Sequence, residues 1–284
     1  MANTKSSIKS LVERLLRFAG HLPPPLRGAF HWRLFCTPFV HRRNPEEVRY
    51  LESGRPFWIP SGPFRVPGWV FPGAGSVVVL CHGWQGSAAS WASLIPLLRE
   101  AGFRVVVFNA PGHHYRPVRS SLPDFTQALR YVVETFGAEY LVGHSFGAMT
   151  TARVLGSGAK VKKAVLFSPP NRLEDLADGF CRRMGMSEQA RAEFYDHLET
   201  SLPEGLARES VCHYLAGVET PMLLFHDVAD EVVPASCSQK ISAELGLPLV
   251  ETEGLGHRKI IRDGELGRRV VEFLLGRTSH GGSH

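Results

Sequence analysis

The sequence has few cysteines, few charges and no long apolar run. Its five cysteines are an odd number at wide, irregular spacing, without a Cys-x-x-Cys pair. This usage argues against a disulfide framework or a cysteine-based metal site and favours reduced thiols. No stretch approaches the ~18 apolar residues of a membrane-spanning helix. With 44% hydrophobic and 21% charged residues, the 284-residue chain has the composition of a soluble globular protein, usually one large domain.

The net charge of +5 is concentrated near the N-terminus. Residues 1–50 hold nine Lys or Arg and three Asp or Glu, so the rest of the chain is close to neutral. Within this segment, residues 7–18 ("SIKSLVERLLRF") place apolar side chains at helical spacing. One interpretation is a basic amphipathic helix that contacts an anionic membrane surface weakly. We favour the other, a helix packed on the domain with its charged face in solvent.

The same segment does not have the form of a signal peptide. Glu13, Arg14 and Arg17 interrupt the apolar run, whereas a signal peptide needs an uninterrupted apolar stretch of about 7 to 15 residues. We therefore expect a cytoplasmic location. We also expect a small molecule as the partner and no nucleic acid.

From Val48 onward, short β-rich runs alternate with helix-like runs, which predicts an α/β fold with a mostly parallel sheet. Two proline- and glycine-bounded segments, "VRYLES" with "PFWIP" and then "FRVPGWVF", are expected as edge strands, where proline is tolerated. Further strands are expected within residues 76–84, 103–113, 138–143, 161–170, 221–234 and 247–252. Helices are expected at residues 88–101, 122–136, 145–156, 188–200, 206–216, 235–245 and 264–275.

The alternation stops after Pro170, where about fifty residues to Thr220 show only helical runs. Such a length favours a helical insertion over a simple crossover. We therefore expect a basic N-terminal helical segment at residues 1–47, packed on or appended to the core. The core would comprise residues 48–168 and 221–278, the helical cap residues 169–220, and a disordered tail residues 279–284.

The pentapeptide Gly143-His144-Ser145-Phe146-Gly147 lies where an expected strand meets an expected helix. Small residues at both ends permit a tight turn that lifts the Ser145 hydroxyl away from the sheet, with a helix N-terminus beneath it. A serine hydroxyl is a weak nucleophile at neutral pH, so a base must take its proton and a third group must orient that base. The pentapeptide alone favours catalysis only modestly over a simple small-residue turn between two elements.

Five motifs fall at the C-terminal ends of expected strands, where open α/β sheets place their sites. They are "HGWQG", "APGH", "GHSFG", "HDVADEVVP" and "GLGH". In these motifs and their order, the chain from Val48 to the C-terminus resembles the α/β-hydrolase superfamily, specifically its serine esterases and lipases with a Ser-Asp-His triad. The resemblance implies an α/β-hydrolase fold, with a mostly parallel central sheet flanked by helices and a helical cap after the sixth strand.

The resemblance implies an acid after the seventh strand, where the sequence offers two carboxylates. The family's D-x-x-V-P pattern matches Asp230 to Pro234, so Asp230 is the expected acid. Asp227 is expected to order the turn instead, because aspartate commonly accepts hydrogen bonds from its own loop backbone.

His257 is the expected base. Of the thirteen histidines, it alone follows the last strand and precedes the last helix, and flanking glycines permit the loop to bring its ring over Ser145. His226 is a rival beside the acid, where a structural role is favoured. His144 is expected to point below the turn into packing. The loop after the fourth strand carries two more histidines, His113 and His114, near the site at most.

The resemblance also implies an oxyanion hole made by the backbone N–H groups of Trp84 and Phe146. The Trp84 side chain has two interpretations: a wall of the acyl pocket, or a ring that fills the core near a turn. Seven apolar side chains of the expected cap would line a substrate pocket or pack on the core: Leu173, Leu176, Phe180, Met184, Met186, Phe194 and Leu198.

The implied reaction is hydrolysis of a carboxylic ester of short or medium acyl length. Ser145 would attack with His257 as base, Asp230 would stabilise the imidazolium, and water would hydrolyse the acyl-enzyme without a metal or organic cofactor. The same triad also serves thioesterases, amidases, perhydrolases and other acyl-transfer enzymes. An alternative of another class is a non-catalytic ligand-binding or membrane-associated module. Haloalkane dehalogenation is disfavoured because its nucleophile is a carboxylate.

Overall fold

The computed structural model describes residues 22–39, 44–61, 64–113, 118–202 and 204–277. The expected helix at residues 7–18, His114 and the expected tail at residues 279–284 lie outside these ranges. The chain divides into two compact units, one from Met1–Thr37 and Arg172–Glu209 and the other from Pro38–Asn171 and Ser210–His284. Within the described ranges, no helix is both long and apolar enough to cross a membrane.

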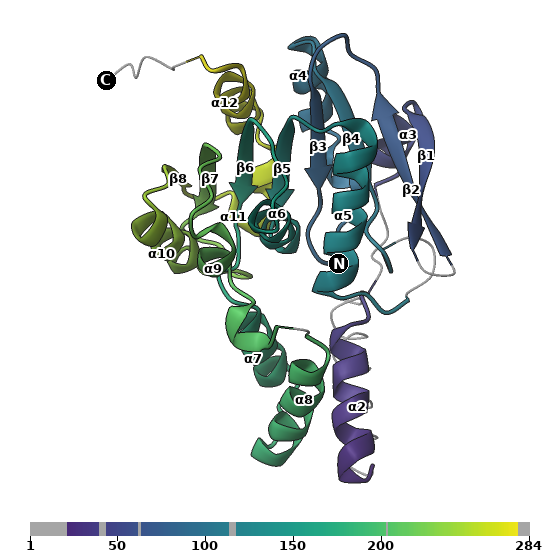
Figure 1. Ribbon diagram of the computed structural model, residues 1–284, viewed down its shortest axis with the longest axis vertical. Helices are drawn as coiled ribbons and strands as arrows, with labels where there is room; N and C mark the ends of the chain where they lie inside the picture. Colours follow the sequence, from purple (N-terminus) through teal and green to yellow (C-terminus); the bar gives the residue numbers. More distant parts are fainter. Residues whose placement is uncertain (1–21, 40–43, 62–63, 114–117, 203, 278–284) are drawn as a thin grey trace. The chain divides into compact units, whose positions relative to one another are not determined.

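The larger unit is built on an eight-stranded sheet in the order β1-β2-β4-β3-β5-β6-β7-β8 (Figure 1). The strands are β1 (Arg55–Ser61), β2 (Phe64–Phe71), β3 (Val77–Cys81), β4 (Arg104–Phe108), β5 (Tyr140–His144), β6 (Lys163–Phe167), β7 (Met222–Asp227) and β8 (Leu249–Thr252). Strand β2 pairs antiparallel with both β1 and β4, and β3 to β8 run parallel to one another. The parallel strands therefore end at one edge of the sheet, which confirms the expected fold class.

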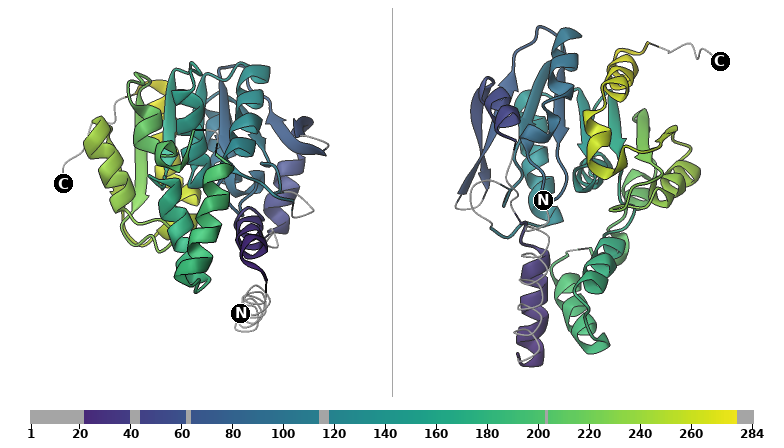
Figure 2. Two further views of the ribbon diagram at one scale, coloured as in Figure 1. Left: turned by 60° about the horizontal axis from the view of Figure 1, so that its bottom comes forward. Right: turned by 180° about the vertical axis from the view of Figure 1, so that it is seen from behind.

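The helices of the larger unit are α3 (Pro45–Glu52), α4 (Leu94–Glu100), α5 (Leu122–Phe136), α6 (Phe146–Gly156), α9 (Val211–Leu215), α10 (Ser236–Leu245), α11 (Gly256–Lys259) and α12 (Gly264–Leu275). Short 3-10 turns are η1 (Ala88–Trp91) and η3 (Ile260–Arg262). Helices α3, α4 and α12 cover one face of the sheet, and α5 and α6 pack together on the other (Figures 1 and 2).

The main core lies between the sheet and helices α3, α4 and α12. Leu80 and Val142 from the central strands pack with Leu51, Leu98 and Val270 from these helices, and all five are at most 2% exposed. The central strands are buried on both faces, which explains why they read as continuous apolar runs. Such burial fixes where each strand ends, and hence where the residues after it lie.

The segment Val48–Ser53, expected as an edge strand, was predicted wrongly. Its residues to Glu52 belong to helix α3 and Ser53 is the C-cap, because the Asn44 side chain accepts the Glu46 N–H at 3.0 Å and Pro45 occupies the first turn. These are strong helix-start signals. The buried Leu51 then packs this short helix on the core.

Strand β2 matches its expected range but is not an edge strand, because it lies between β1 and β4. Its pairing with β4 starts at Gly68, so Pro67 lies outside that ladder and accepts the Asn109 N–H through its carbonyl at 2.9 Å. A proline is tolerated at this position because it lies outside the pairing with β4, so no hydrogen bond of that pairing requires its missing N–H.

The smaller unit contains α2 (Pro24–Phe35), α7 (Leu173–Arg183), α8 (Glu188–Thr200) and η2 (Leu206–Arg208). Helices α2 and α8 lie side by side, and the Arg27 guanidinium binds both carboxylate oxygens of Glu193 at 2.8 and 2.6 Å. At Gly28, a Cβ would lie 2.5 Å from the Glu193 carbonyl oxygen, so only glycine allows this close approach.

The helices are grouped into units differently from the domain ranges expected from the sequence. Helix α2 packs with the insertion helices because of its ion pair to α8 and the rings of Phe35 and Phe180, whose centroids are 5.2 Å apart. Helix α9, expected within the cap, contacts α6 and α10 in the larger unit.

Candidate active site

Ser145 lies on a sharp turn between β5 and α6. Its backbone has φ 54° and ψ −122°, a conformation that L-residues adopt only under strain. Its N–H donates to the Phe167 carbonyl at 2.8 Å, and its own carbonyl accepts the Ala148 N–H at 2.9 Å. These bonds hold the strained turn between strand and helix, as a nucleophile elbow requires.

The two glycines of the pentapeptide are required by space. A Cβ on Gly143 would lie 2.6 Å from the Ala148 Cα, and one on Gly147 would lie 2.3 Å from the Cys81 carbonyl oxygen. Any side chain at either position would therefore push α6 away from the central strands.

His257, at the start of α11, connects Ser145 with Asp230. Its Nε2 lies 2.9 Å from the Ser145 Oγ, and its Nδ1 lies 2.7 Å from the Asp230 Oδ2. Because an ionised carboxylate only accepts, Nδ1 carries the hydrogen, and Nε2 is free to accept the serine proton. The structure thus brings together the three residues selected from the sequence, in the tautomer that a general base needs.

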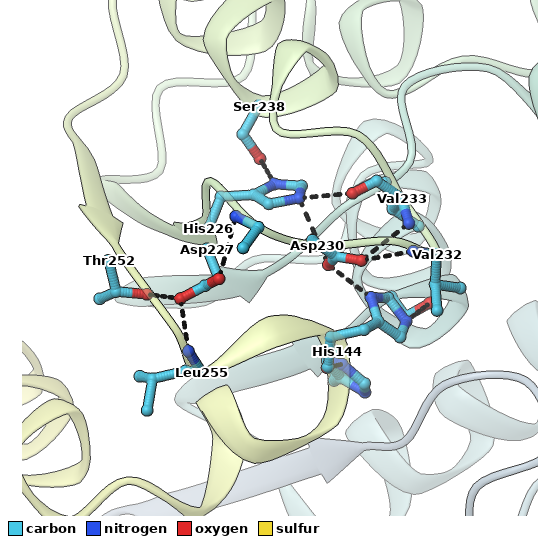
Figure 3. A network of polar contacts seen from close by, with 12 residues as sticks. His144, His226, Asp227, Asp230, Val232, Val233, Ser238, Thr252 and Leu255 are labelled. Atoms are coloured by element: carbon cyan, nitrogen blue, oxygen red, sulfur yellow. Dashed lines mark hydrogen bonds and ion pairs between the residues drawn. The ribbon is translucent and has the colours of Figure 1, made fainter.

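Asp230 is buried in the loop after β7, and its carboxylate accepts several hydrogen bonds (Figure 3). Its Oδ1 accepts the N–H groups of Val232 and Val233 at 2.8 and 2.9 Å. Burial alone would raise the pKa of Asp230. Hydrogen bonds from His226, His257 and the Val233 amide outweigh burial and hold this pKa below its usual range. Asp230 therefore stays ionised.

Asp227 and His226 hold the loops around the site. The Asp227 Oδ2 accepts the Thr252 hydroxyl at 2.8 Å and the Leu255 N–H at 2.9 Å, so it links β7 to the loop before His257 (Figure 3). The His226 Nε2 donates to the Val233 carbonyl at 2.9 Å, and its Nδ1 contacts the Ser238 hydroxyl at 2.6 Å.

Burial alone would raise the pKa of Asp227. Hydrogen bonds from the Leu255 amide and the Thr252 hydroxyl lower it below the usual range instead.

The loop after β3 lies against the nucleophile. A Cβ on Gly83 would be 2.9 Å from the Ser145 Cβ, so Trp84 begins directly beside the serine. The His82 Nε2 accepts the Ala110 N–H at 2.9 Å, which leaves its Nδ1–H to donate to the Gly83 carbonyl at 2.8 Å.

The Gly83 carbonyl also accepts the Gly86 N–H at 3.0 Å. In a trans peptide the N–H points opposite to the carbonyl, so these two bonds fix the direction of the Trp84 N–H. The second expected donor, the Phe146 N–H, belongs to the first residue of α6 and has no acceptor within the helix. The sequence does not reveal this role of His82, and its only signal is that His82 lies at a strand end.

The Trp84 ring packs among aromatic side chains. Its centroid lies 5.4 Å from that of Phe146, 6.0 Å from Phe125 and 4.9 Å from His113. His113 is itself buried, with its Nδ1 2.8 Å from the Pro111 carbonyl oxygen. Both residues therefore serve at least as packing beside the elbow.

Comparison with known proteins agrees with this architecture. Residues 76–211 match the family model of the alpha/beta hydrolase fold. The chain is 26% identical to a non-heme chloroperoxidase of Streptomyces lividans over 242 residues, covering 66% of this chain and 86% of that protein. It is 27% identical to a bifunctional esterase/perhydrolase of Acinetobacter calcoaceticus over 223 residues, covering 60% and 79%.

Solved structures of similar fold include an esterase of Pyrococcus furiosus. The two share 18% identity with a TM-score of 0.62, covering 84% of this chain and 95% of the esterase. A bromoperoxidase of Bacillus anthracis matches with a TM-score of 0.59 at 20% identity, covering 78% and 99%. The chain therefore has the α/β-hydrolase fold. The resemblance to the α/β-hydrolase superfamily drawn from its motifs is confirmed.

Proposed function

We propose that the protein is a serine hydrolase that cleaves carboxylic esters through an acyl-enzyme on Ser145. The observation that carries this proposal is the continuous set of hydrogen bonds from the Ser145 hydroxyl through His257 to Asp230. A ligand-binding module has no need of a strained serine with a correctly protonated base beside it.

In the first step the Ser145 Oγ attacks the ester carbonyl carbon while its proton passes to the His257 Nε2. The resulting imidazolium lies against the ionised Asp230, whose buried carboxylate stabilises the positive charge. The tetrahedral intermediate then collapses: the bond to the alcohol oxygen breaks, and His257 returns its proton to the leaving alcohol.

Negative charge on the former carbonyl oxygen would be stabilised by the N–H groups of Phe146 and Trp84. The first is supported by its place at the start of α6, and the second by the bonds that hold the Gly83 carbonyl. In the second step His257 takes a proton from water, and the hydroxide attacks the acyl carbon. The bond from that carbon to the Ser145 Oγ then breaks, His257 returns its proton to this oxygen, and the carboxylic acid is released.

The preference for esters of short or medium acyl length rests on the surroundings of the elbow. Phe146 follows Ser145 directly, its ring centroid lies 5.4 Å from that of Trp84, and such an aromatic pair suits an uncharged acyl group. The names of two similar proteins, an esterase and a bifunctional esterase/perhydrolase, support ester chemistry.

Perhydrolysis is a second candidate because similar proteins include haloperoxidases and a perhydrolase. The acyl-enzyme on Ser145 would react with hydrogen peroxide in place of water, giving a peroxyacid and free serine. His257 would take the peroxide proton as it takes that of water.

A panel of p-nitrophenyl esters of increasing acyl length, run beside acyl-thioesters and amides, tests the proposal. We expect the highest kcat/KM for short or medium esters, and a loss of about 10⁴-fold or more in Ser145→Ala. Ser157→Ala, beyond the other end of α6, is the matched control and should retain activity. Two results would contradict the proposal. One is folded Ser145→Ala protein that hydrolyses the esters at the wild-type rate, and the other is wild-type protein that hydrolyses no compound of the panel.

A further inference from the structure

His144 makes a contact that the sequence did not predict. The residue ends β5, directly before Ser145, and its side chain is buried. Its Nε2 lies 2.8 Å from the main-chain carbonyl oxygen of His257, although the two residues are far apart in the chain. The ring centroids of the two histidines are 4.8 Å apart. The residue before the nucleophile thus holds the backbone of the base.

The chemistry of this contact fixes the state of the His144 ring. A carbonyl oxygen only accepts, so the Nε2 of His144 must carry the hydrogen. Burial, with a further contribution from nearby His257, lowers the pKa of His144 to about 3. The ring is therefore neutral at working pH and keeps one tautomer while His257 gains and loses its proton.

The backbone around His257 needs such a restraint. Gly254 and Gly256 have φ of 86° and 59°, with open space where a Cβ would stand. Glycines leave a loop many alternative conformations. The Asp227 carboxylate holds the chain at Leu255, two residues before the base. His144 supplies the restraint at His257 itself.

We propose that His144 is a positioning residue that fixes the distance between the Ser145 hydroxyl and the His257 ring. This inference rests on the proposed function, since it assigns His257 the role of base. Because His144 is covalently joined to Ser145, its bond to the His257 carbonyl couples the elbow to the base loop. A displacement of about 1 Å at a reacting group can reduce a rate by ~10²-fold.

A role in packing alone predicts a different outcome from a role in positioning. His144→Gln keeps an N–H donor at similar reach, whereas His144→Met has similar length and volume and no donor. Both variants alter the packing, but only His144→Met loses the bond to the His257 carbonyl. The pair therefore separates the hydrogen bond from the filled volume.

The experiment measures ester hydrolysis, reaction with a fluorophosphonate, and amide hydrogen exchange on wild type and both variants. We expect His144→Met to lower kcat and the phosphonylation rate by about 10- to 100-fold with KM little changed, because the His144 side chain is buried. Exchange in peptides covering residues 253–261 should rise, while exchange in α5 stays unchanged. His144→Gln should recover most of both properties.

Three results would overturn the inference. One is a His144→Met enzyme that reacts at the wild-type rate. Another is equal loss in the glutamine and methionine variants with equal thermal destabilisation, which indicates packing. The third is unchanged exchange at residues 253–261, a result that does not depend on activity. A wild type that fails to react with any substrate or fluorophosphonate would instead refute the proposed function.

Discussion

The Asp227 carboxylate accepts the main-chain N–H of Leu255 at 2.9 Å, which fastens the end of β7 to the loop before His257. Asp230, three residues further along the chain, binds the His257 ring itself. Two neighbouring buried carboxylates thus serve one histidine in different ways: the first holds the backbone two residues before it, and the second holds its side chain.

Substitution of the two carboxylates should therefore have different effects. Asp230→Asn removes the acceptor that fixes the His257 tautomer, so kcat should fall by about 10⁴-fold, with thermal stability affected less. Asp227→Asn should mainly cost stability, about 1–3 kcal/mol, because its NH2 must face either the Ala229 or the Leu255 N–H and leaves that donor without an acceptor. Kinetics and denaturant unfolding of both variants check this. A larger loss of kcat in Asp227→Asn would exchange the two assignments.

The buried His144 predicts how stability depends on pH. Its pKa of about 3 lies below its ordinary value of 6.5, so between these values the unfolded chain binds a proton that the folded protein does not. Stability should therefore fall as pH is lowered from about 6.5. Asp227 and Asp230, whose folded pKa values are also lowered, act in the same direction but only below about pH 4.

The variant His144→Gln isolates this effect, since glutamine does not titrate. Relative to its own value at pH 8, the variant should lose about 2 kcal/mol less stability than wild type on going to pH 5. Urea unfolding at a series of pH values measures the difference. Parallel curves for the two proteins between pH 8 and 5 would show that His144 is protonated alike in the folded and unfolded states.

The elbow glycine Gly147 predicts a steep steric penalty. Gly147→Ala would bring a Cβ within 2.3 Å of the Cys81 carbonyl oxygen, so we expect a loss of at least ~2 kcal/mol and of activity. Gly179→Ala in α7 is the matched control, because the nearest atom is the flexible end of Arg183 at 3.4 Å. The control should gain about 0.5–1 kcal/mol from helix propensity. Equal stability of the two variants would contradict this packing.

The smaller unit should depend on the ion pair between Arg27 and Glu193. Arg27→Met removes a two-point hydrogen-bonded contact between α2 and α8, so amide exchange in both helices should rise while β5 is unaffected. Arg191→Met is the control on α8, because the ion pair of Arg191 with Asp178 is more exposed than that of Arg27 with Glu193 and should contribute less. Unchanged exchange in α2 would show that ring packing alone holds these helices.

The parallel strands and the residues after them could be predicted, because a strand buried on both faces has a continuous run of apolar residues in the sequence. Strand ends then place Ser145, Asp230 and His257 at one edge of the sheet, and chain order assigns them. A strand was wrongly predicted at Val48–Ser53, where the structure has the end of helix α3, because valine and tyrosine favour strands. The Asn44-Pro45 start signal outweighs that preference here.

The contacts of the buried histidines could not be predicted in the same way. The bonds from His82 to the Gly83 carbonyl and from His144 to the His257 carbonyl depend on tertiary distance, not on local spacing. The pairing of α2 with α8 is a further example. It joins segments 166 residues apart through Arg27 and Glu193, and nothing in either segment marks the other as its partner.

The role of Ser145 as the nucleophile is tested most directly by mass spectrometry of the protein after reaction with a fluorophosphonate. We expect one added phosphonyl group, mapped to the peptide that carries Ser145, with loss of fluoride and no adduct on Ser145→Ala. The rate of labelling should also fall sharply in His257→Ala. Labelling of a different serine, or none on folded wild-type protein, would contradict the claim that Ser145 is the activated nucleophile.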